Sequence, residues 1–345
     1  MTRLVDGYDL VIFDLDGVVY LIDEPIAGAA EAVERLRAEG TAIAYATNNA
    51  SRRAADVAGA LTGMGVPAAP GEVLTSAGAA AARLAQQLPA GAPVLVVGAE
   101  ALRAEVRDAG LTVVERAEDE PAAVVQGFGP EVGWKLLSEA ALAVRAGALW
   151  VATNTDRTLP SPRGPLPGNG SLVAVLRTAL DRDPDLVVGK PAPALFETAA
   201  GLSKARRPLA VGDRLDTDIE GAVGAGFDSL LVLTGVSGPA ELLAAPPERR
   251  PTYVAEDLSG LFEPPVRLKA EEGARESAEE GAKQRAEEGA EEGSGWQLED
   301  GTLTGAGKPA AALALLAAHV WSGGKTPRPG SDAAADLMNR WKLNP

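Results

Sequence analysis

The chain has 345 residues, of which 46% are hydrophobic and 23% are charged, as is typical of a soluble globular protein. Its length predicts two domains and a remainder. There is no cysteine and a single histidine, His319, so the composition excludes thiol catalysis, disulfide frameworks and metal sites built from cysteines or from several histidines. The formal net charge of −16 argues against a nucleic-acid-binding protein, because such a protein usually presents a basic face to phosphate.

No segment reads as a membrane span. The longest apolar run, 310–321, is interrupted by His319 and is shorter than the roughly 18 residues that cross a bilayer. The N-terminus lacks the long apolar stretch of a signal peptide, because the apolar residues 10–13 lie between Asp9 and Asp14. We therefore expect a cytoplasmic protein that binds neither a membrane nor a nucleic acid.

Short apolar runs alternate with helical patterns from residue 9 to residue 263. Residues 10–13 are apolar without alternation, which predicts a strand buried on both faces of a parallel sheet. Residues 27–39 carry apolar side chains spaced by three and four and precede Gly40, which predicts a helix with a glycine just past its end. Further strands are predicted at 42–47, 94–97, 123–126, 149–153, 186–188, 209–211 and 230–233. This alternation indicates an α/β fold with a parallel sheet.

Residues 266–295 differ from the rest in composition. Three similar units of eight residues begin at Ala270, Ala278 and Ala286, and the segment holds nine glutamates against five lysines and arginines. Each unit contains a glycine, which weakens a helix, and none has an apolar stripe. We interpret the segment as an acidic low-complexity linker in solvent, with a binding tail as the alternative.

Residues 296–345 predict a small helical module of unknown role. Leu313, Leu316, Ala317 and Val320 recur on one face of a helix. The sequence leaves open whether this module packs on the main body. Because the motifs described below all lie upstream, we expect a chain without residues 267–345 to fold and to keep its activity.

Four polar segments each follow a predicted strand, at the edge of a parallel sheet where ligands bind. The first contains Asp14 and Asp16, and Gly17 permits a turn there. Two carboxylates so close together favour a hard cation such as Mg²⁺ between them. The alternative is that Asp14 caps a turn and that Asp16 is solvated.

The other three segments add phosphate-binding groups and further carboxylates. Thr47 and Asn48 follow one strand and could cradle a phosphate with a hydroxyl and main-chain N–H groups. Lys190 follows another strand and could reach a phosphate as a mobile charge. Residues 212–218 bring three more carboxylates. Taken singly, these segments could be an ordinary turn, a surface lysine and a helix N-cap.

Together and in this order, the segments resemble the haloacid dehalogenase superfamily of aspartyl phosphohydrolases. Asp14-Leu15-Asp16-Gly17-Val18 matches motif I, Thr47 motif II, Lys190 motif III, and Gly212-Asp213 with Asp218 motif IV. The roughly 140 residues between Thr47 and Lys190 exceed what one crossover needs. They resemble the C2-type cap of subfamily IIA, which contains p-nitrophenyl, phosphoglycolate, glycerol-3-phosphate and pyridoxal phosphatases.

The resemblance implies a Rossmann-like core in two parts, 1–75 and 181–265, with an inserted α/β cap at 76–180. The fold class is therefore predicted as α/β. We also expect a homo-oligomer formed through the cap. One segment departs from the subfamily pattern, because Gly127-Phe128-Gly129-Pro130 stands where many members have Gly-Tyr-Asp.

The resemblance further implies the roles of the site residues. Asp14 would be the nucleophile, and Asp16 the general acid and later the general base. Mg²⁺ would be held by Asp14, the main-chain carbonyl of Asp16, and Asp213. Thr47, the main chain of Asn48, and Lys190 would hold the phosphoryl oxygens, with Asp218 in a supporting role. Candidate substrate contacts at the end of a cap strand, with a polar turn as the alternative, are Asn154, Asp156 and Arg157.

The implied activity is hydrolysis of a small phosphomonoester. Glycerol 3-phosphate and 2-phosphoglycolate are favoured over pyridoxal 5′-phosphate. The alternatives are a phosphotransferase or mutase of the same superfamily and a non-catalytic binding protein on the same scaffold. A nucleotide-binding P-loop at Gly324-Lys325-Thr326 is rejected, because the earlier glycine of that motif falls on His319 and no strand precedes it.

Overall fold

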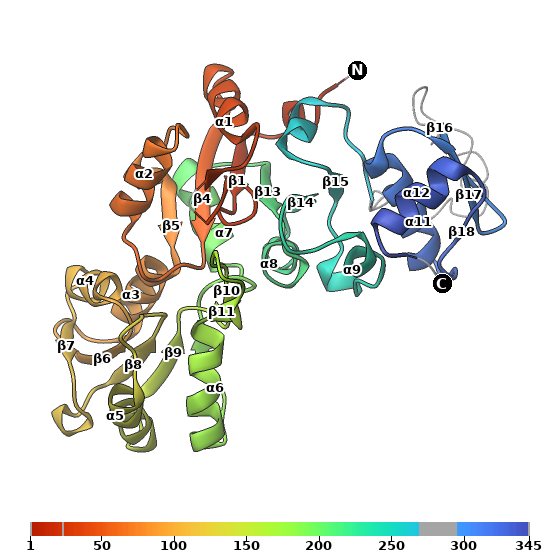
Figure 1. Cartoon of the computed structure of the whole chain (residues 1–345). Coiled ribbons are helices and arrows are strands. Elements are labelled where there is room, and N and C mark those ends of the chain that lie inside the picture. The colour runs from red at the N-terminus through yellow and green to blue at the C-terminus, as the bar shows by residue number, and fades with distance from the viewer. Residues whose placement is uncertain (1, 23, 269–294, 344–345) are drawn as a thin grey trace, which may run out of the picture. The chain divides into compact units, whose positions relative to one another are not determined.

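The computed structural model describes residues 2–22, 24–268 and 295–343 (Figure 1). The chain divides into two compact units, one formed by Asp9–Pro208 and the other by Met1–Tyr8 together with Leu209–Pro345. The three predicted acidic repeats lie outside the described residues. The two units are described separately below.

The Asp9–Pro208 unit begins with a parallel sheet in the order β1 (Leu10–Phe13), β4 (Ala42–Thr47), β5 (Val73–Thr75). All four side chains of β1 are buried, as the unbroken apolar run predicts. The strands predicted at 10–13 and 42–47 are confirmed, and the predicted helix 27–39 is confirmed with slightly narrower bounds. The remaining elements around this sheet are β2 (Tyr20–Leu21), β3 (Glu24–Pro25), α1 (Ala29–Ala38), α2 (Ala54–Gly63) and α7 (Ala194–Ser203).

A second parallel sheet of this unit has the strand order β12-β9-β8-β6-β7. Its strands alternate buried side chains between the two faces. Val94 and Val96 pack in one apolar cluster, and Leu95 and Val97 in another. The strands are β6 (Pro93–Val97), β7 (Thr112–Val114), β8 (Ala123–Gln126), β9 (Leu149–Ala152) and β12 (Leu186–Val187).

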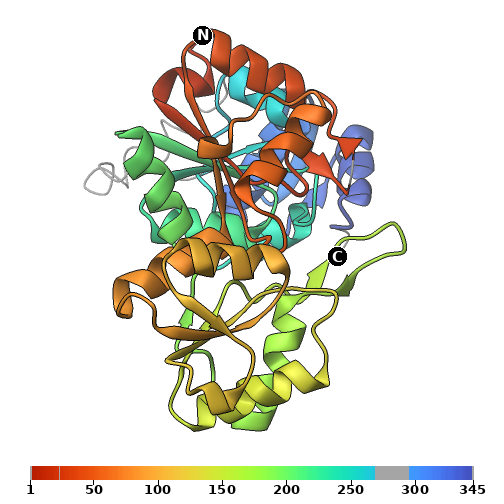
Figure 2. The same ribbon diagram turned by 90° about the vertical axis from the view of Figure 1, so that its left-hand side faces the viewer.

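Helices cover both faces of this second sheet, which gives a three-layer α/β/α arrangement (Figure 2). α3 (Ser76–Gln87) and α4 (Glu100–Asp108) pack on one face, and α5 (Trp134–Arg145) and α6 (Asn169–Leu180) pack on the other. The sheet lies in the segment predicted as the cap. β12 extends it past residue 180, where the predicted cap ends.

The second unit contains a parallel sheet of β13 (Pro208–Gly212), β14 (Asp228–Val232) and β15 (Tyr253–Ala255). The strands predicted at 209–211 and 230–233 are confirmed, whereas the three-residue strand β15 was not predicted. Between these strands lie a π-helical turn at Leu215–Ile219, α8 (Glu220–Gly224) and α9 (Pro239–Leu243).

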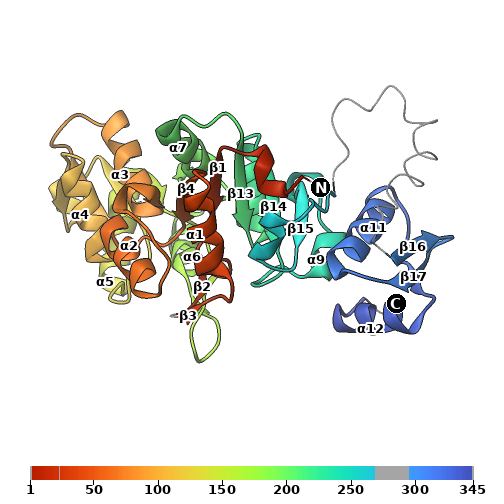
Figure 3. The same ribbon diagram turned by 90° about the horizontal axis from the view of Figure 1, so that it is seen from above.

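The C-terminal module is not only helical, which corrects the prediction for residues 296–345. It contains a three-stranded sheet together with α11 (Pro309–Trp321) and α12 (Asp332–Arg340) (Figure 3). Its strands are β16 (Gly295–Glu299), β17 (Thr302–Ala306) and β18 (Arg328–Pro329). Asp300 and Gly301, with φ of 47° and 71°, form the tight turn between β16 and β17. An Asp-Gly pair between strands is a strong hairpin signal, so this hairpin could have been read from the sequence.

This module shares one apolar core with the rest of its unit. Leu313 and Leu316 of α11 and Met338 of α12 are fully buried in the same cluster as Leu242 and Val254. The Trp321 indole also donates a hydrogen bond to the Leu242 carbonyl at 3.3 Å. The removal of residues 267–345 would expose this cluster to water, which counts against the expectation that the shortened chain folds.

The predicted linker also begins later than residue 266. Arg267 forms an antiparallel bridge with Tyr253, and the Leu268 N–H donates to the Thr252 carbonyl at 2.8 Å. Leu268 itself is buried in the apolar core of its unit. Among the described residues, no helix combines the length and the apolar character needed to cross a membrane.

We predict that Leu316→Ala lowers the free energy of unfolding by about 2–5 kcal/mol, because it opens a cavity in the shared core. Denaturant unfolding followed by tryptophan fluorescence measures this loss. The matched control in the same unit is Val236→Ala at a side chain that is 66% exposed, which should change stability by about 0.5 kcal/mol or less. Equal effects of the two substitutions would show that α11 does not contribute to the core.

Candidate active site

The loop after β1 carries Asp14 and Asp16 out of a fully buried strand. Gly17 has a φ of +88°, a conformation that favours glycine and allows the chain to turn directly after the carboxylates. The Leu15 carbonyl accepts hydrogen bonds from the N–H groups of residues 18, 19 and 20, which fixes the turn. The two predicted catalytic carboxylates are therefore held by a short, hydrogen-bonded loop at the end of a rigid strand.

Lys190 lies against the first of these carboxylates. Its ammonium donates to the Asp14 carboxylate and, at 2.9 Å, to the Ala46 carbonyl at the end of β4. The Lys190 side chain is 2% exposed and the Asp14 side chain is 12% exposed. The structure thus brings together the predicted motif I and motif III residues, which are 176 positions apart in the chain.

Burial raises the pKa of Asp16, which keeps its proton to a higher pH than an exposed aspartate. The positive charges of Lys190 and Arg52 and a hydrogen bond with Tyr20 oppose this shift but do not cancel it. A carboxyl group with a raised pKa is better suited to general-acid chemistry than an ordinary aspartate is. Arg52 and Tyr20 were not predicted as site residues. A cation five positions after Thr47, in the predicted phosphate-binding loop, was the available signal for Arg52.

Asn48 was predicted to bind phosphate through its main chain, but the sequence did not reveal the hydrogen bonds of its side chain. Its side-chain amide donates to both carboxylate oxygens of Asp156 at 3.1 Å and to the Lys190 carbonyl at 3.0 Å. Its own carbonyl accepts from the Ser76 hydroxyl at 2.6 Å and from the Asn154 amide at 2.7 Å. The preceding Thr47 is almost fully buried at the end of β4. Asn48 therefore ties the end of β4 to the loops that follow β9 and β12.

The three predicted substrate contacts differ in their surroundings. Asn154 is 4% exposed, and its side chain bonds the Asn48 carbonyl and the Asp156 N–H, which agrees with the alternative of a polar turn. Asp156 is half-buried and faces the Asn48 amide. Arg157 is exposed, and its carbonyl accepts from the Gly168 N–H and the Ser171 hydroxyl.

The second unit holds the predicted motif IV residues after β13. Asp213 is fully buried, and its carboxylate accepts the Val236 N–H at 2.7 Å. Asp218 is also buried and accepts the Arg214 N–H at 3.1 Å. Gly212 is required beside Asp218, because a Cβ at that position would collide with the Asp218 side chain. Buried carboxylates of this kind are hard oxygen donors, which fits Mg²⁺.

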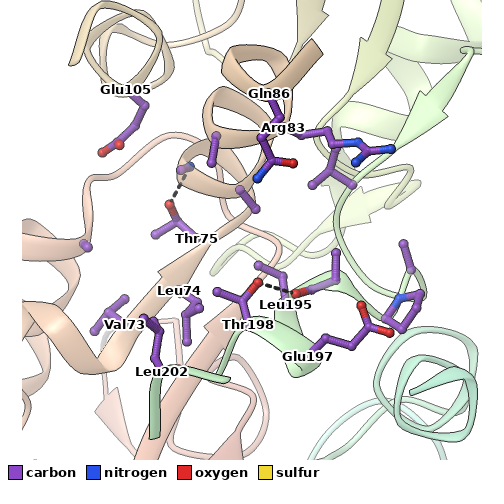
Figure 4. A pocket seen from close by; sticks show the side chains of 18 of the residues that line it. Val73, Leu74, Thr75, Arg83, Gln86, Glu105, Leu195, Glu197, Thr198 and Leu202 are labelled. Atoms are coloured by element: carbon purple, nitrogen blue, oxygen red, sulfur yellow. Dashed lines mark hydrogen bonds between the residues drawn. The ribbon is translucent and has the colours of Figure 1, made fainter. Parts of the chain in front are cut away.

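A separate pocket of about 700 Å³ lies in the Asp9–Pro208 unit (Figure 4). Residues of β5, α3 and α7 line it, among them Thr75, whose hydroxyl accepts the Gly78 N–H at 3.1 Å. None of the predicted catalytic, phosphate-binding or metal-binding residues lines this pocket. It is therefore not the candidate active site.

Comparison with known proteins gives consistent matches. The family described as haloacid dehalogenase-like hydrolase matches residues 11–112, and the one described as HAD-hydrolase-like matches residues 187–261. The D-glycerol 3-phosphate phosphatase of Mycobacterium tuberculosis is 51% identical over 263 residues, which are 76% of this chain and 73% of that protein.

Solved structures agree with these sequence matches. A glycerol phosphate phosphatase from Mycobacterium tuberculosis in complex with magnesium has a TM-score of 0.87 and 42% identity, over 100% of both chains. A 4-nitrophenylphosphatase from Thermotoga maritima has a TM-score of 0.70 and 31% identity, over 75% of this chain and 98% of that chain. The first match covers the whole of this chain, including the C-terminal module. The second match covers only 75% of this chain.

We predict that Asn48→Ala loosens the loop after β9, because it removes the hydrogen bonds to Asp156 and to the Lys190 carbonyl. Each lost bond of this kind costs about 1 kcal/mol. Amide hydrogen exchange of residues 153–157, followed by mass spectrometry, should become at least about tenfold faster.

The matched control is Asn49→Ala. The Asn49 side chain accepts only local hydrogen bonds, from the N–H and the hydroxyl of Ser51. Exchange at 153–157 should therefore stay within about twofold of the unsubstituted chain. If the two variants exchange alike, Asn48 does not hold this loop.

Proposed function

The chain belongs to the haloacid dehalogenase-like hydrolases, and we propose that it is a magnesium-dependent phosphatase of small phosphomonoesters, with glycerol 3-phosphate as the favoured substrate. The likeness to a 4-nitrophenylphosphatase confirms the predicted resemblance to subfamily IIA. The phosphatase class rests on relatives that are named phosphatases and that align over most of this chain.

One observation carries the proposal for the site. The buried ammonium of Lys190 contacts the Asp14 carboxylate, and Asp16, two residues further on, has a raised pKa. This arrangement supports our proposal that Asp14 is the nucleophile beside a positive charge and that Asp16 is the proton donor. Lys190, Asp14 and Asp16 together are suited to the cleavage of a phosphate ester. This reaction requires that negative charge is neutralised and that the leaving oxygen is protonated.

The reaction would proceed in two displacements. An Asp14 carboxylate oxygen attacks phosphorus, and the bond from phosphorus to the substrate oxygen breaks while Asp16 gives its proton to that oxygen. Water then attacks phosphorus while Asp16 accepts a proton from it; the bond between phosphorus and the Asp14 oxygen breaks, which restores the Asp14 carboxylate and releases inorganic phosphate. Thr47, the main chain of Asn48, and Lys190 would hold the phosphoryl oxygens throughout both steps.

We assign the metal to the Asp14 and Asp213 carboxylates and to the Asp16 carbonyl, by their positions in the family motifs. When bound, Mg²⁺ neutralises charge on the phosphate and on the attacking carboxylate. The support is the oxygen-donor chemistry of these groups and the complete burial of Asp213. Asp218 would act as a positioning residue for this part of the site.

The substrate proposal rests on the Mycobacterium tuberculosis relative named D-glycerol 3-phosphate phosphatase. Among the predicted contacts, Asp156 and Arg157 could hydrogen-bond the hydroxyl groups of a small polyol, and Arg52 is a further candidate. Asn154 contributes by holding the loop, since its side chain is bonded within the protein. 2-Phosphoglycolate and pyridoxal 5′-phosphate are less favoured.

The alternatives are less well supported. A mutase or phosphotransferase would retain all four motifs, but the relatives reported above are phosphatases. A non-catalytic binding protein would not need both Asp14 and Asp16. We also keep the proposal of a homo-oligomer through the cap, where Trp134 of α5 is 83% exposed; the mass of the protein in solution tests it.

We predict that purified protein releases inorganic phosphate in the presence of Mg²⁺ and that EDTA abolishes this release. Among glycerol 3-phosphate, 2-phosphoglycolate and pyridoxal 5′-phosphate, the first should give the highest kcat/KM. Asp14→Asn should lower kcat at least about a hundredfold, because it removes the nucleophile.

Several outcomes would contradict this. Formation of an isomeric phosphate without free phosphate would favour a mutase, and no turnover of any substrate would favour a binding protein. A nucleotide or phosphopeptide that leads by tenfold in kcat/KM would overturn the choice of a small phosphomonoester.

A further prediction separates the acid role of Asp16 from other roles. In single-turnover reactions, Asp16→Asn should slow phosphorylation of Asp14 by glycerol 3-phosphate more than by p-nitrophenyl phosphate, whose leaving group needs little protonation. With the unsubstituted chain and glycerol 3-phosphate, this step should slow as the pH rises through the raised pKa of Asp16, because the proton is then lost. Equal losses for both substrates would exclude the acid role.

A further inference from the structure

The C-terminal module borders a cavity of about 890 Å³ that the phosphatase reaction does not use. Residues of α9, the β16–β17 turn, the end of α11 and the end of the described chain line it. Its apolar lining residues, here called the apolar wall, include Leu243 and Leu343, which are buried in the core of the unit. Its basic lining residues are Lys325, Arg328 and Lys342, all three of them exposed. Cavities of this size accommodate small organic ligands.

The positive charge of this cavity contrasts with the chain as a whole. The formal net charge of the chain is −16, whereas residues 295–345 contain five lysines and arginines against four aspartates and glutamates. Three of those five basic residues line the cavity. Asp300 is the one carboxylate among the lining residues. The basic side chains of the module are therefore concentrated around one hollow.

Hydrogen bonds hold the main chain of two of these basic residues. The Arg328 N–H donates to the Gly301 carbonyl at 2.8 Å, and Arg328 pairs in register with Thr302 of β17. Lys342 follows α12, and its N–H donates to the Asn339 carbonyl at 3.0 Å. Arg328 and Lys342 come from separate segments of the chain, and the fold brings both to the same cavity.

Lys325 reaches the cavity from the loop that follows α11. The Gly324 N–H donates to the His319 carbonyl at 3.0 Å, and a Cβ at Gly324 would collide with the His319 ring. Glycine therefore lets the loop lie directly against His319, which also lines the cavity beside Lys325 and Thr326. The sequence excluded a nucleotide-binding P-loop at Lys325. In the structure, this lysine lines the cavity instead.

The electrostatic balance of the cavity favours an anion. In the part of the chain that the structure describes, none of Lys325, Arg328 and Lys342 forms an ion pair with a carboxylate. Cations around one hollow repel each other, and a bound anion would remove that repulsion. A ligand with several negative charges matches three cations better than a single charge does, and the apolar wall could accept an uncharged ring or chain.

We propose that this cavity binds a multiply charged organic phosphate, with its phosphates on Lys325, Arg328 and Lys342 and its organic part on the apolar wall. The proposal is independent of the phosphatase function, because the residues that form the cavity all lie outside the four motifs. ATP is a suitable probe of this class, inorganic pyrophosphate tests the charged part alone, and adenosine tests the organic part alone.

Isothermal titration calorimetry of ATP into the full chain in EDTA tests the proposal. We expect binding that the double variant Lys325→Gln, Lys342→Gln weakens at least about tenfold, because it removes two of the three cations. The matched control is Lys308→Gln, Arg340→Gln, which removes the same charge from the same module outside the cavity. This control should change the dissociation constant less than about twofold.

Each other outcome overturns the proposal in a defined way. No binding of ATP by the unsubstituted chain, or equal weakening in the two double variants, would show that the cavity is not an anion site. Pyrophosphate binding as tight as that of ATP would exclude a role for the apolar wall and thus the organic-phosphate class. Adenosine binding as tight as that of ATP would exclude the cations as the recognition element.

Discussion

The contact between the Lys190 ammonium and the Asp14 carboxylate is the interaction on which the site depends. Both groups are almost removed from water, and a charge so buried must be paired. The removal of one partner of such a pair costs about 3–5 kcal/mol, although an apolar replacement of both is often neutral. The pair is therefore better explained by the proposed phosphate binding than by a contribution to folding stability. It holds the positive charge of Lys190 beside Asp14, where the proposed reaction would bring the negative phosphate.

The same burial sets the properties of the neighbouring acid. The loss of hydration raises the pKa of Asp16, and the positive charges of Lys190 and Arg52 oppose this shift without cancelling it. The fully buried strand β1 and the turn at Gly17 hold the loop that carries both carboxylates.

Much of the fold could be predicted, whereas very short strands and long-range side-chain contacts could not. Long apolar runs such as Leu10–Phe13 and Ala42–Thr47 gave correct strands, because a central parallel strand must be apolar on both faces. Strands of three residues, such as β7 and β15, carry too little pattern to be recognised. The motif residues were identifiable by type and order, whereas the side-chain bonds of Asn48 to Asp156 join positions 108 apart and leave no local signal.

The positions of the motifs did not reveal how the C-terminal module packs. All four motifs lie before residue 219, and this made residues 267–345 look dispensable. Yet the apolar face of α11 completes a cluster that includes Leu215 and Ile219, the apolar residues of the same π-helical turn that carries Asp218. Because interiors are closely packed, a change in α11 can alter the position of that turn. The module therefore belongs to the structure that supports motif IV, even though it contributes none of the motif residues.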